Sequence, residues 1–444
     1  MNAFQRTKGL LLAVMAGAWC ITAPAQESPP GASVASLLVV AQQVNPEYAS
    51  MRFEVQAADE RVGPAGALPD PLFRIELMDI TRGGQQSPTL WPGDVGSTRY
   101  TLSQNLPWFG KRDLKRDIAA LDAQAVAARL KQGWSELATQ IKTTHALRYF
   151  HHSSRDLSRE ILALMIRLEK ITQVRYANGL AAQQDVIRAQ IEQTNMKVEL
   201  AALANEGVQM DARLNALLAR PAAAPLAEPQ GWRPLPSPDK LDALTLQERL
   251  RVGNPQLFAD ESRIQAAGKV RDLAYKNRYP DFNFGLSFTQ YPGDASVVAP
   301  MGTPQHSMAP VPSGANEWAV MVELNIPLQQ ASRRAQERES EAMLEAARAR
   351  KESSANRLLA ELSDQLSAID AAGNVGLLAA TSLLPQAELT FNAALAGYEN
   401  GKVDFATLLD AQRQIRQAKQ SQLKAQYETQ VRLAEIEKLL GEDL

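Results

Sequence analysis

Two very long helical stretches limit the folds that this chain can adopt. Residues Gly110–Tyr176 run for 67 positions without a proline, and Gln329–Tyr398 run for 70, with interruptions expected only near Gly373, Gly376 and Pro385. Both stretches are rich in Ala, Leu, Gln, Glu, Lys and Arg, which mostly favour helix. At 1.5 Å per residue each helix would be roughly 100 Å long. Helices of this length do not fit inside one compact globule, so they predict a coiled coil or a barrel of helices.

The sequence also repeats itself. Four short sequence motifs recur in the same order, at offsets of 209, 211, 220 and 222 residues. The pairs are Asn45-Pro46 with Asn254-Pro255, Leu68-Pro69-Asp70 with Tyr279-Pro280-Asp281, Asn105-Leu106-Pro107 with Asn325-Ile326-Pro327, and Tyr176-Ala177-Asn178-Gly179 with Tyr398-Glu399-Asn400-Gly401. An ordered return of this kind predicts an internal duplication. We expect a first structural repeat at residues 26–220, a linker at 221–236 and a second repeat at 237–444.

Each repeat has the same predicted order of elements. A leading helix is followed by two strands, then by the long helix and a returning helix. The returning helices are expected at 181–219 and 403–440, and the leading helices at 34–58 and at 237–276, the latter broken near Asn254-Pro255. Gly179 and Gly401 end the two long helices, because glycine readily adopts the left-handed conformation that stops a helix. Each repeat therefore ends in an antiparallel helical hairpin.

The four predicted strands have the length of strands that span a membrane. They lie at 72–80, 100–106, 282–289 and 318–326, and apolar residues alternate with polar ones most clearly in the second repeat. One face is expected to meet lipid and the other a water-filled lumen. The expected lipid-facing residues are Phe284, Phe288, Val320 and Val322, and the residues opposite them are Asn283, Ser287, Ala319 and Met321. The loops at 82–96 and 291–316, rich in Gly and Pro, are expected to be extracellular.

Four strands cannot close a barrel, and an open sheet edge is not tolerated in lipid. If these strands lie in a membrane, the chain must therefore oligomerise. Two copies would supply eight strands and three would supply twelve, and the strand pattern alone leaves both open. The expected fold is mainly α-helical, with long hairpins forming a helical barrel and four strands per chain contributing to a small membrane β-barrel.

The N-terminus predicts export. Arg6 and Lys8 precede a short apolar run, and Ala23-Pro24-Ala25 is a typical cleavage site, so residues 1–25 are expected to be a signal peptide. Cys20 is the only cysteine in the chain. Cleavage before it, followed by lipidation, is the alternative, although bulky Trp19 stands where a small residue is needed.

Charge and motifs exclude several classes of function. The chain has 47 Lys and Arg against 49 Asp and Glu, so it lacks the basic surplus of a nucleic-acid-binding protein. No H-E-x-x-H, P-loop or G-x-S-x-G motif is present. We therefore expect no enzyme activity, no cofactor and no metal site.

The order of elements resembles the TolC family of outer-membrane efflux proteins. The resemblance covers about Ser36–Gly441, and its more specific marks are the junction Gln104–Arg112 and the hairpin Tyr398–Gly401 leading to Leu408–Gln412. It implies a homotrimer with a twelve-stranded barrel in the bacterial outer membrane and a twelve-helix tunnel in the periplasm. The implied partners are outer-membrane lipid, a periplasmic adaptor protein and an inner-membrane RND pump.

The implied function is a passive exit duct for substrates that the pump expels. The sequence Pro-Trp-Phe-Gly-Lys-Arg at residues 107–112 resembles that of family members that serve heavy-metal RND efflux, so heavy-metal cations are the expected cargo. A duct for organic toxicants or for type I protein secretion is the alternative. A periplasmic coiled-coil adaptor is the alternative of a different class, but an adaptor would carry one hairpin flanked by many short strands.

The resemblance also implies a periplasmic gate. Asp410 would belong to an acidic ring at the narrow mouth, and Asp185 would belong to a closing network with Tyr398. Thr407 stands where a second acidic ring would be, and Val403 stands where a basic link residue would be, so how the gate is latched is open. The competing interpretation of Asp410 and Asp185 is that they are solvated helix carboxylates.

Other candidate residues have two interpretations each. Trp108 and Phe109 form either an aromatic belt at the membrane interface, with Lys111 and Arg112 in the headgroup zone, or a buried packing corner. The histidines of the first long helix, His145, His151 and His152, are expected to be solvated polar residues rather than metal ligands. The thioether and imidazole groups of Met301, His306 and Met308 suit Cu(I) or Ag(I), but an ordinary loop is favoured there.

Overall fold

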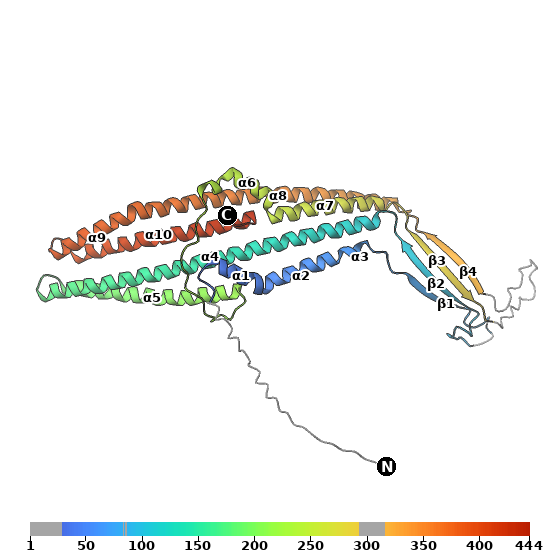
Figure 1. Ribbon diagram of the computed structural model, residues 1–444, viewed down its shortest axis with the longest axis horizontal. Helices are drawn as coiled ribbons and strands as arrows, with labels where there is room; N and C mark the ends of the chain where they lie inside the picture. The colour runs from blue at the N-terminus through green and yellow to red at the C-terminus, as the bar shows by residue number, and fades with distance from the viewer. Residues whose placement is uncertain (1–28, 83, 85–86, 293–315) are drawn as a thin grey trace, which may run out of the picture.

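The computed structural model describes residues 29–82, 84, 87–292 and 316–444 of the chain. The predicted signal peptide, Cys20 and the loop residues Met301, His306 and Met308 lie outside the described residues. The molecule is elongated, with a small sheet at one end and the two hairpin turns at the other (Figure 1). The predicted class, long helices with a small four-stranded sheet, is what the protomer shows.

The two long hairpins form most of the molecule. In the first half, α4 (Lys111–Ala177) runs for 67 residues and α5 (Gln183–Leu217) returns beside it. In the second half, α8 (Gln330–Leu378) and α9 (Leu384–Glu399) lead to the returning α10 (Phe405–Leu440). Five residues between α8 and α9, Ala379–Leu383, wind as a π-helix. The interruption falls there and not at Gly373 or Gly376, because nearby Pro385 cannot donate a backbone hydrogen bond.

Shorter helices lead into each half. They are α1 (Val34–Val44), α2 (Pro46–Glu60) and α3 (Val62–Gly66) in the first half, and a short 3-10 turn η1 (Pro238–Leu241), α6 (Ala243–Gly253) and α7 (Pro255–Lys276) in the second. The prediction of one unbroken helix at 34–58 is wrong, because the chain breaks at Asn45. A residue before proline avoids the helical conformation, and Asn45 is accordingly extended, with ψ 120°.

Both Asn-Pro breaks make the same contacts. The Oδ1 atom of Asn45 accepts from the Tyr48 N–H at 2.9 Å, and its Nδ2 donates to the Leu217 carbonyl at 2.9 Å. Asn254 does likewise with the Leu257 N–H, at 3.0 Å, and with the Leu439 carbonyl, at 2.7 Å. Each buried asparagine therefore starts a helix and fastens it to the end of the returning helix in its own half.

The sheet joins the two halves. Its strands are β1 (Leu72–Met78), β2 (Ser97–Leu106), β3 (Phe282–Gln290) and β4 (Asn316–Leu324), all antiparallel, in the order β1-β2-β3-β4. The central pairing runs from Thr98 opposite Gln290 to Leu106 opposite Phe282. Strands β1 and β4 are the two edges of this sheet, with no further strand beside either in the described protomer.

The register separates an apolar face from a polar one. Phe284 lies opposite Val322, Leu286 opposite Val320 and Phe288 opposite Trp318, so these apolar side chains share one face. The other face carries Gly285, Ala319 and Met321, together with the charged residues Arg74, Glu76, Arg99, Glu317 and Glu323. This is the alternation that a barrel strand between lipid and water requires.

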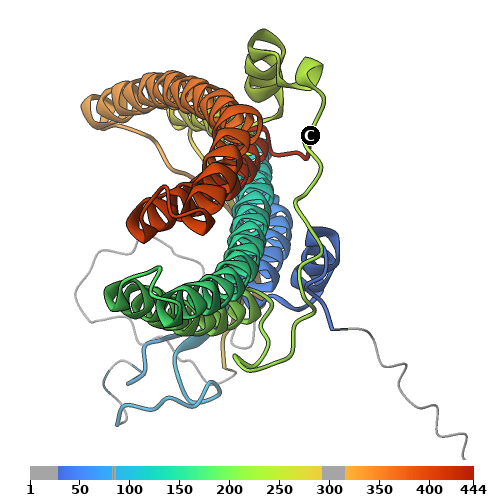
Figure 2. The ribbon, with the colours of Figure 1, turned by 90° about the vertical axis from the view of Figure 1, so that its left-hand side faces the viewer.

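The helices lie side by side in a curved wall, as the view along the molecule shows (Figure 2). Helix α4 packs against α5 and α10, and α10 packs against α8, so α5 and α8 are at the two sides of the wall. The linker between α5 and α6 crosses the wall at mid-height (Figures 1 and 2).

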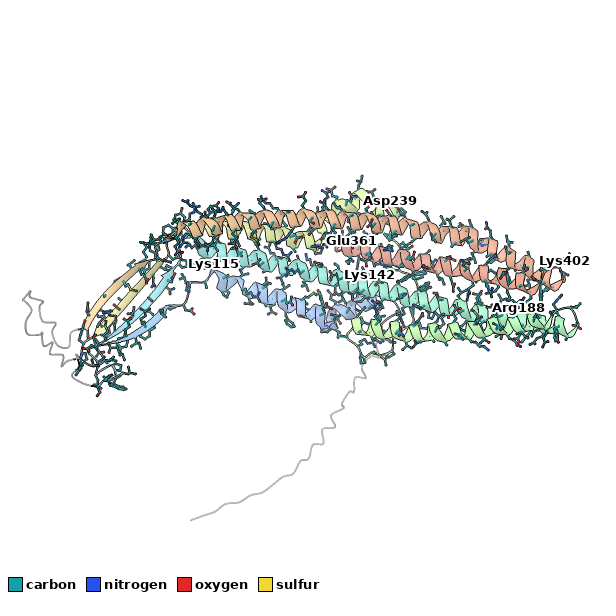
Figure 3. The ribbon with its side chains drawn as sticks, turned by 180° about the vertical axis from the view of Figure 1, so that it is seen from behind. Lys115, Lys142, Arg188, Asp239, Glu361 and Lys402 are labelled. Carbon is teal, nitrogen blue, oxygen red and sulfur yellow. The ribbon has the colours of Figure 1, made fainter. Side chains whose placement is uncertain are left out.

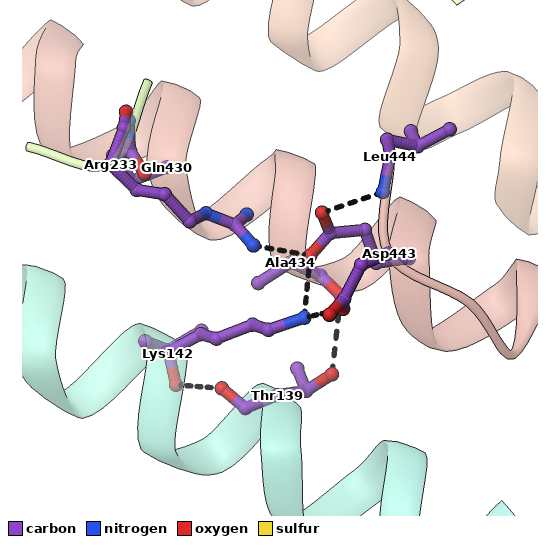
Figure 4. A network of polar contacts seen from close by, with 9 residues as sticks. Thr139, Lys142, Arg233, Gln430, Ala434, Asp443 and Leu444 are labelled. Carbon is purple, nitrogen blue, oxygen red and sulfur yellow. Dashed lines mark hydrogen bonds and ion pairs between the residues drawn. The ribbon is translucent and has the colours of Figure 1, made fainter. Parts of the chain in front are cut away.

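A buried ionic network fastens this linker (Figure 4). Glu437 of α10 accepts from Lys142 of α4 at 2.8 Å, from Arg233 of the linker at 2.7 Å and from the Leu444 backbone N–H at 3.2 Å. Gln430 donates to the Arg233 carbonyl at 2.7 Å. The network therefore ties α4, α10, the linker and the C-terminus together at mid-height.

Candidate functional site

The hairpin ends are the first candidate site, and both are built on the same turn. Gly179 and Gly401 have φ of +71° and +68°, the left-handed conformation expected from the sequence. The next residue donates back to the carbonyl five positions earlier: Leu180 to Arg175 and Lys402 to Gly397, both at 2.8 Å. This pairing closes the last helical turn and reverses the chain.

Tyr398 is buried in the last turn of α9. Only 3% of it is exposed, and its ring lies 5.5 Å from that of Phe405. Its hydroxyl is buried without a hydrogen-bond partner among the described residues. Asp185 lies in the first turn of α5, and no hydrogen bond joins it to the Tyr398 hydroxyl among the described residues. The closing network expected of the two stays a prediction.

Arg175, which the sequence analysis did not single out, reaches Tyr398 instead. It comes from the last turn of α4, and its guanidinium carbon lies 4.9 Å from the centre of the Tyr398 ring. The same group donates to the carbonyls of Glu399 and of Leu180, the latter at 3.2 Å. A basic residue in the last turn of a helix is common, and its partners lie in the other hairpin, so no local signal reveals this role.

Asp410 lies on the exposed side of α10. Its side chain is 68% exposed, and Arg413 Nη1 lies 3.5 Å from its Oδ1. Arg413 also pairs with Glu192 of α5. Further along α10, Arg416 pairs with Glu199 of α5 at 2.8 Å, and Lys419 pairs with Glu160 of α4 at 2.9 Å. The basic side chains of α10 therefore form ion pairs with acidic residues of the first hairpin.

Thr407 and Val403, which depart from the family pattern, have local structural roles. Asp404 precedes α10 and accepts from the hydroxyl of Thr407 and from its backbone N–H, the latter at 2.9 Å. These two hydrogen bonds, from the hydroxyl and then the N–H, hold the pKa of Asp404 below its usual value. Val403 packs over Gly397, where an added Cβ would lie 2.6 Å from a Val403 methyl group. Thr407 therefore completes a helix cap and Val403 fills the turn.

The junction between sheet and helices is the second candidate site. The Trp108 ring stacks on Tyr279 at 5.1 Å and on Phe282 at 5.7 Å, whereas Phe109 is 79% exposed. Trp108 therefore belongs to a packed corner and Phe109 lies at the surface of the protomer, while their place at the membrane interface stays a prediction. Gly110 has φ +78°, and an added Cβ would meet Lys276 Nζ at 2.6 Å, so glycine is needed there.

Lys111 is buried, contrary to the expectation that it lies in the headgroup zone. Its Nζ donates to Asp281 Oδ1 at 2.8 Å and to the Tyr279 carbonyl at 3.0 Å. The Trp108 N–H donates to the same Asp281 oxygen at 2.8 Å. Burial works against ionisation of Asp281, but the hydrogen bonds from Lys111 and Trp108 outweigh it, and the pKa of Asp281 is lowered. Arg112 donates to the Gly66 carbonyl at 2.9 Å.

Known proteins share both sequence and fold with this chain. Residues 246–442 match the family described as "Outer membrane efflux protein". The fold matches the solved channel CusC, with a TM-score of 0.74 at 16% identity over 92% of each chain. It also matches the outer membrane protein VceC of Vibrio cholerae, with a TM-score of 0.74 at 17% identity over 92% of this chain and 96% of that one. The second half of the chain therefore matches this family, and the whole chain shares the fold of these solved channels, in agreement with the resemblance to the TolC family.

A curated relative of this chain is the cobalt-zinc-cadmium resistance protein CzcC of Cupriavidus metallidurans. The two are 28% identical over 279 residues, which cover 60% of this chain and 58% of that protein. The family consists of outer-membrane channels and not of enzymes. The homologues are outer-membrane efflux channels with a periplasmic helical barrel.

The histidines of α4 differ in burial. His145 is 4% exposed, so the expectation that it is solvated is wrong. Burial, and then the nearby charge of Arg148, lower its pKa to about 4, so it is neutral at neutral pH. His151 and His152 are partly buried, 3.2 Å from carboxylates of Glu206 and Asp156. No group of three metal-binding side chains gathers anywhere in the described ranges.

Proposed function

We propose that this chain forms the outer-membrane duct of a tripartite efflux system, closed as a homotrimer. The open sheet carries the proposal. Strand β4 is exposed along its whole length, β1 is its counterpart at the other edge, and one face of the sheet is apolar. Unpaired edges in lipid cost several kcal/mol per group, so β4 of one copy must pair with β1 of the next. Three copies would give twelve strands.

The helical wall supports the same closure. Its two sides carry exposed apolar residues: Ile187, Ile191 and Val198 on α5, and Val375, Leu378 and Leu389 on α8 and α9. One apolar window within Gln330–Glu399 is long and apolar enough to cross a membrane, and only 17% of it is buried in the protomer. We infer that α8 and α9 of one copy cover α5 of the next, a head-to-tail contact that closes into a ring. The proposed two-fold repeat of each chain would then give a near-regular wall.

Heavy-metal cations are the proposed cargo. CzcC, the relative described above, is a resistance protein for cobalt, zinc and cadmium. The polar face of the sheet carries the carboxylates Glu76, Glu317 and Glu323 against the guanidinium groups Arg74 and Arg99. A lumen with a carboxylate surplus favours cations over anions. An inner-membrane RND pump and a periplasmic adaptor would supply the energy and the connection.

We further propose that the hairpin ends form the periplasmic mouth. Asp410 and Asp185 lie on the two returning helices near these ends. In a trimer each would occur three times around one axis. Their exposed carboxylates could then line a narrow opening, while Trp108 and Phe109 mark the membrane interface at the other end of the molecule.

A growth assay tests the function directly. A deletion strain would be grown on copper, silver, zinc, cobalt, nickel, cadmium and organic drugs, with and without a plasmid-borne copy. Selective sensitivity to metals supports the proposed cargo, and sensitivity to drugs alone favours the organic alternative. The purified protein should migrate as a trimer in detergent gels unless boiled, and a soluble monomer would rule out the duct in favour of an adaptor.

A further inference from the structure

A cavity of about 420 Å³ lies at mid-height, between the helical wall and the segments that cover it. It is bounded by the start of α1, by α4, by the linker and by Asp443, and its apolar lining residues include Val34, Leu38 and Trp232. Figure 2 shows α1 and the linker on the convex side of the curved wall, whereas a lumen would occupy the concave side. The volume is in the range of small-molecule sites, and the proposed duct gives this cavity no task.

The charges beside this cavity compensate one another. Lys142 pairs with Glu437 at 2.8 Å and also with Asp443, and Arg233 pairs with Glu437 at 2.7 Å. Two cations thus face two carboxylates (Figure 4). A charged ligand would have to compete with a partner that is already in place, at the cost of its own desolvation. The arrangement therefore favours a neutral ligand.

Two buried polar atoms at this cavity are unpartnered. His145 is 4% exposed, and its Nε2 has no hydrogen-bond partner among the described residues. The same holds for Nη2 of Arg233. Both residues line the cavity and also a recess of about 10 Å³, which shares further lining residues with it, among them Lys142 and Trp232. A recess of this size has room for one water molecule or one hydroxyl group.

The two atoms differ in what they need. The His145 ring is neutral, and the carbonyl groups of Ala32 and Gly31 are placed to accept its one N–H. The other ring nitrogen is then an acceptor, whereas the guanidinium of Arg233 can only donate. A hydroxyl group accepts and donates at the same time, so it satisfies both. We propose that the cavity binds a neutral pyranose sugar, one hydroxyl of which fills the recess between Arg233 and His145.

The rest of the cavity suits a sugar ring. Pyranoses have apolar C–H faces that pack on aromatic rings, and Trp232 supplies such a ring. The indole is held in place, because its N–H donates to Gln426 at 2.9 Å and the ring of Tyr149 lies 4.6 Å away, nearly at right angles. Ser33 and Gln230 add polar side chains to the lining for further hydroxyl groups. The site goes beyond the proposed function, since it requires a folded chain but no conducting channel.

Titration of the purified protein tests the site, with N-acetylglucosamine and glucose as probes. The protein would carry 5-fluorotryptophan, and the ¹⁹F signal of Trp232 would be assigned with Trp232→Phe. The detergent must lack a sugar headgroup, because an alkyl glucoside or maltoside would itself supply the ligand. The signal should shift and saturate, with a Kd of about 1 mM. Glucuronate, which adds a charge to the ring, and cyclohexanol, which keeps one hydroxyl, should bind at least about tenfold more weakly.

Two variants place the sugar in this cavity. Ala35 is exposed on α1 and lines the cavity, so Ala35→Phe should fill it and abolish the shift. Val39→Phe is the matched control, one turn further along α1, at a residue that is 56% exposed and outside the lining. His145→Phe removes the acceptor and should weaken binding about tenfold. If Ala35→Phe does not assemble, His145→Phe decides.

The outcomes separate this site from the duct. No shift of the Trp232 signal in the parent means that the recess holds water only, and this overturns the proposal whatever the variants do. An equal shift in Ala35→Phe, or equal binding of glucuronate or cyclohexanol, overturns it as well. A trimer of N-acetylglucosamine that binds more tightly than the monomer indicates the end of a longer glycan, and one that binds more weakly indicates a free sugar. A channel that fails to conduct would overturn the duct and leave the sugar site standing.

Discussion

The two ends of the protomer are held in different ways. At the sheet end, Lys111 and Asp281 form a pair beside the stacked rings of Trp108, Tyr279 and Phe282. At the hairpin end, the side chains of Asp410 and Arg413 are more than half exposed. A buried cation with several hydrogen bonds fixes a single geometry, whereas exposed pairs contribute little. The difference indicates a rigid joint at the sheet end and weaker ion pairs at the hairpin end.

The largest effect is expected within the sheet. Val320 lies mid-strand on the apolar face of β4, so Val320→Arg would place a charge in lipid. The expected cost is about 2–4 kcal/mol per copy, repeated in every copy of the assembly. Met321→Arg is the matched control, because the neighbouring residue points to the polar face. The assembled fraction, measured by unboiled gel migration, should collapse for Val320→Arg only. Equal loss in both variants would mean that the assignment of the faces is wrong.

The joint itself should be the next most sensitive region. Lys111→Gln would leave the carboxylate of Asp281, which is 33% exposed, without its cation, at a cost of about 1–2 kcal/mol. Lys115, one turn further along α4 (Figure 3), is exposed, and Lys115→Gln should change stability by less than about 0.5 kcal/mol. Thermal unfolding of the two variants measures the difference. Equal unfolding midpoints for Lys111→Gln and Lys115→Gln would contradict a rigid joint.

The contrast between the ends also explains what the sequence could and could not predict. The bounds of the two long hairpins, the turns at Gly179 and Gly401 and the alternation in β3 and β4 depend on neighbouring residues, and the predictions for them agree with the structure. The burial of Lys111 depends on Asp281, 170 positions away, and the role of Arg175 depends on Glu399, 224 positions away. The sequence predicts the break at Asn254-Pro255 but not the one at Asn45-Pro46. In residues 34–58 the apolar pattern favours one continuous helix, although the proline carries the same signal in both places.

Between the two ends, His145 should make stability depend on pH. Its pKa in the folded chain is about 4 against 6.5 for a free histidine, so the folded state favours the neutral form. The stabilisation is complete above about pH 6.5 and is lost as the pH falls towards 4. About 2 kcal/mol per chain should disappear between pH 7 and pH 5. Across this range the unfolding midpoint should depend less on pH in His145→Gln than in the parent. In His152→Gln it should depend on pH as it does in the parent. An unchanged slope in His145→Gln would show that other groups set the pH dependence.

The smallest effect is expected at the mouth, where charges compensate one another. Arg413 lies 3.5 Å from Asp410, so each carboxylate of the proposed ring brings a guanidinium with it. Asp410→Asn should then lower the cation-to-anion permeability ratio by only about twofold, as removal of an exposed, paired charge would. Arg413→Gln should raise the ratio by a similar factor, because it leaves the carboxylate uncompensated. Asp410→Asn should leave the unfolding midpoint unchanged, whereas Arg413→Gln should lower it slightly, because Glu192 loses its partner.

Reversal potentials under a salt gradient in planar bilayers measure both ratios in the same experiment. Opposite shifts of the reversal potential in the two variants support a ring in which the charges of Asp410 and Arg413 partly cancel in every copy. A large shift in Asp410→Asn with none in Arg413→Gln would mean that Arg413 is fully engaged by Glu192 and leaves the ring acidic. No shift in either variant would place Asp410 outside the conducting path, as a solvated residue of α10. The mouth would then be lined by other groups, while the rigid joint at the sheet end would be unaffected.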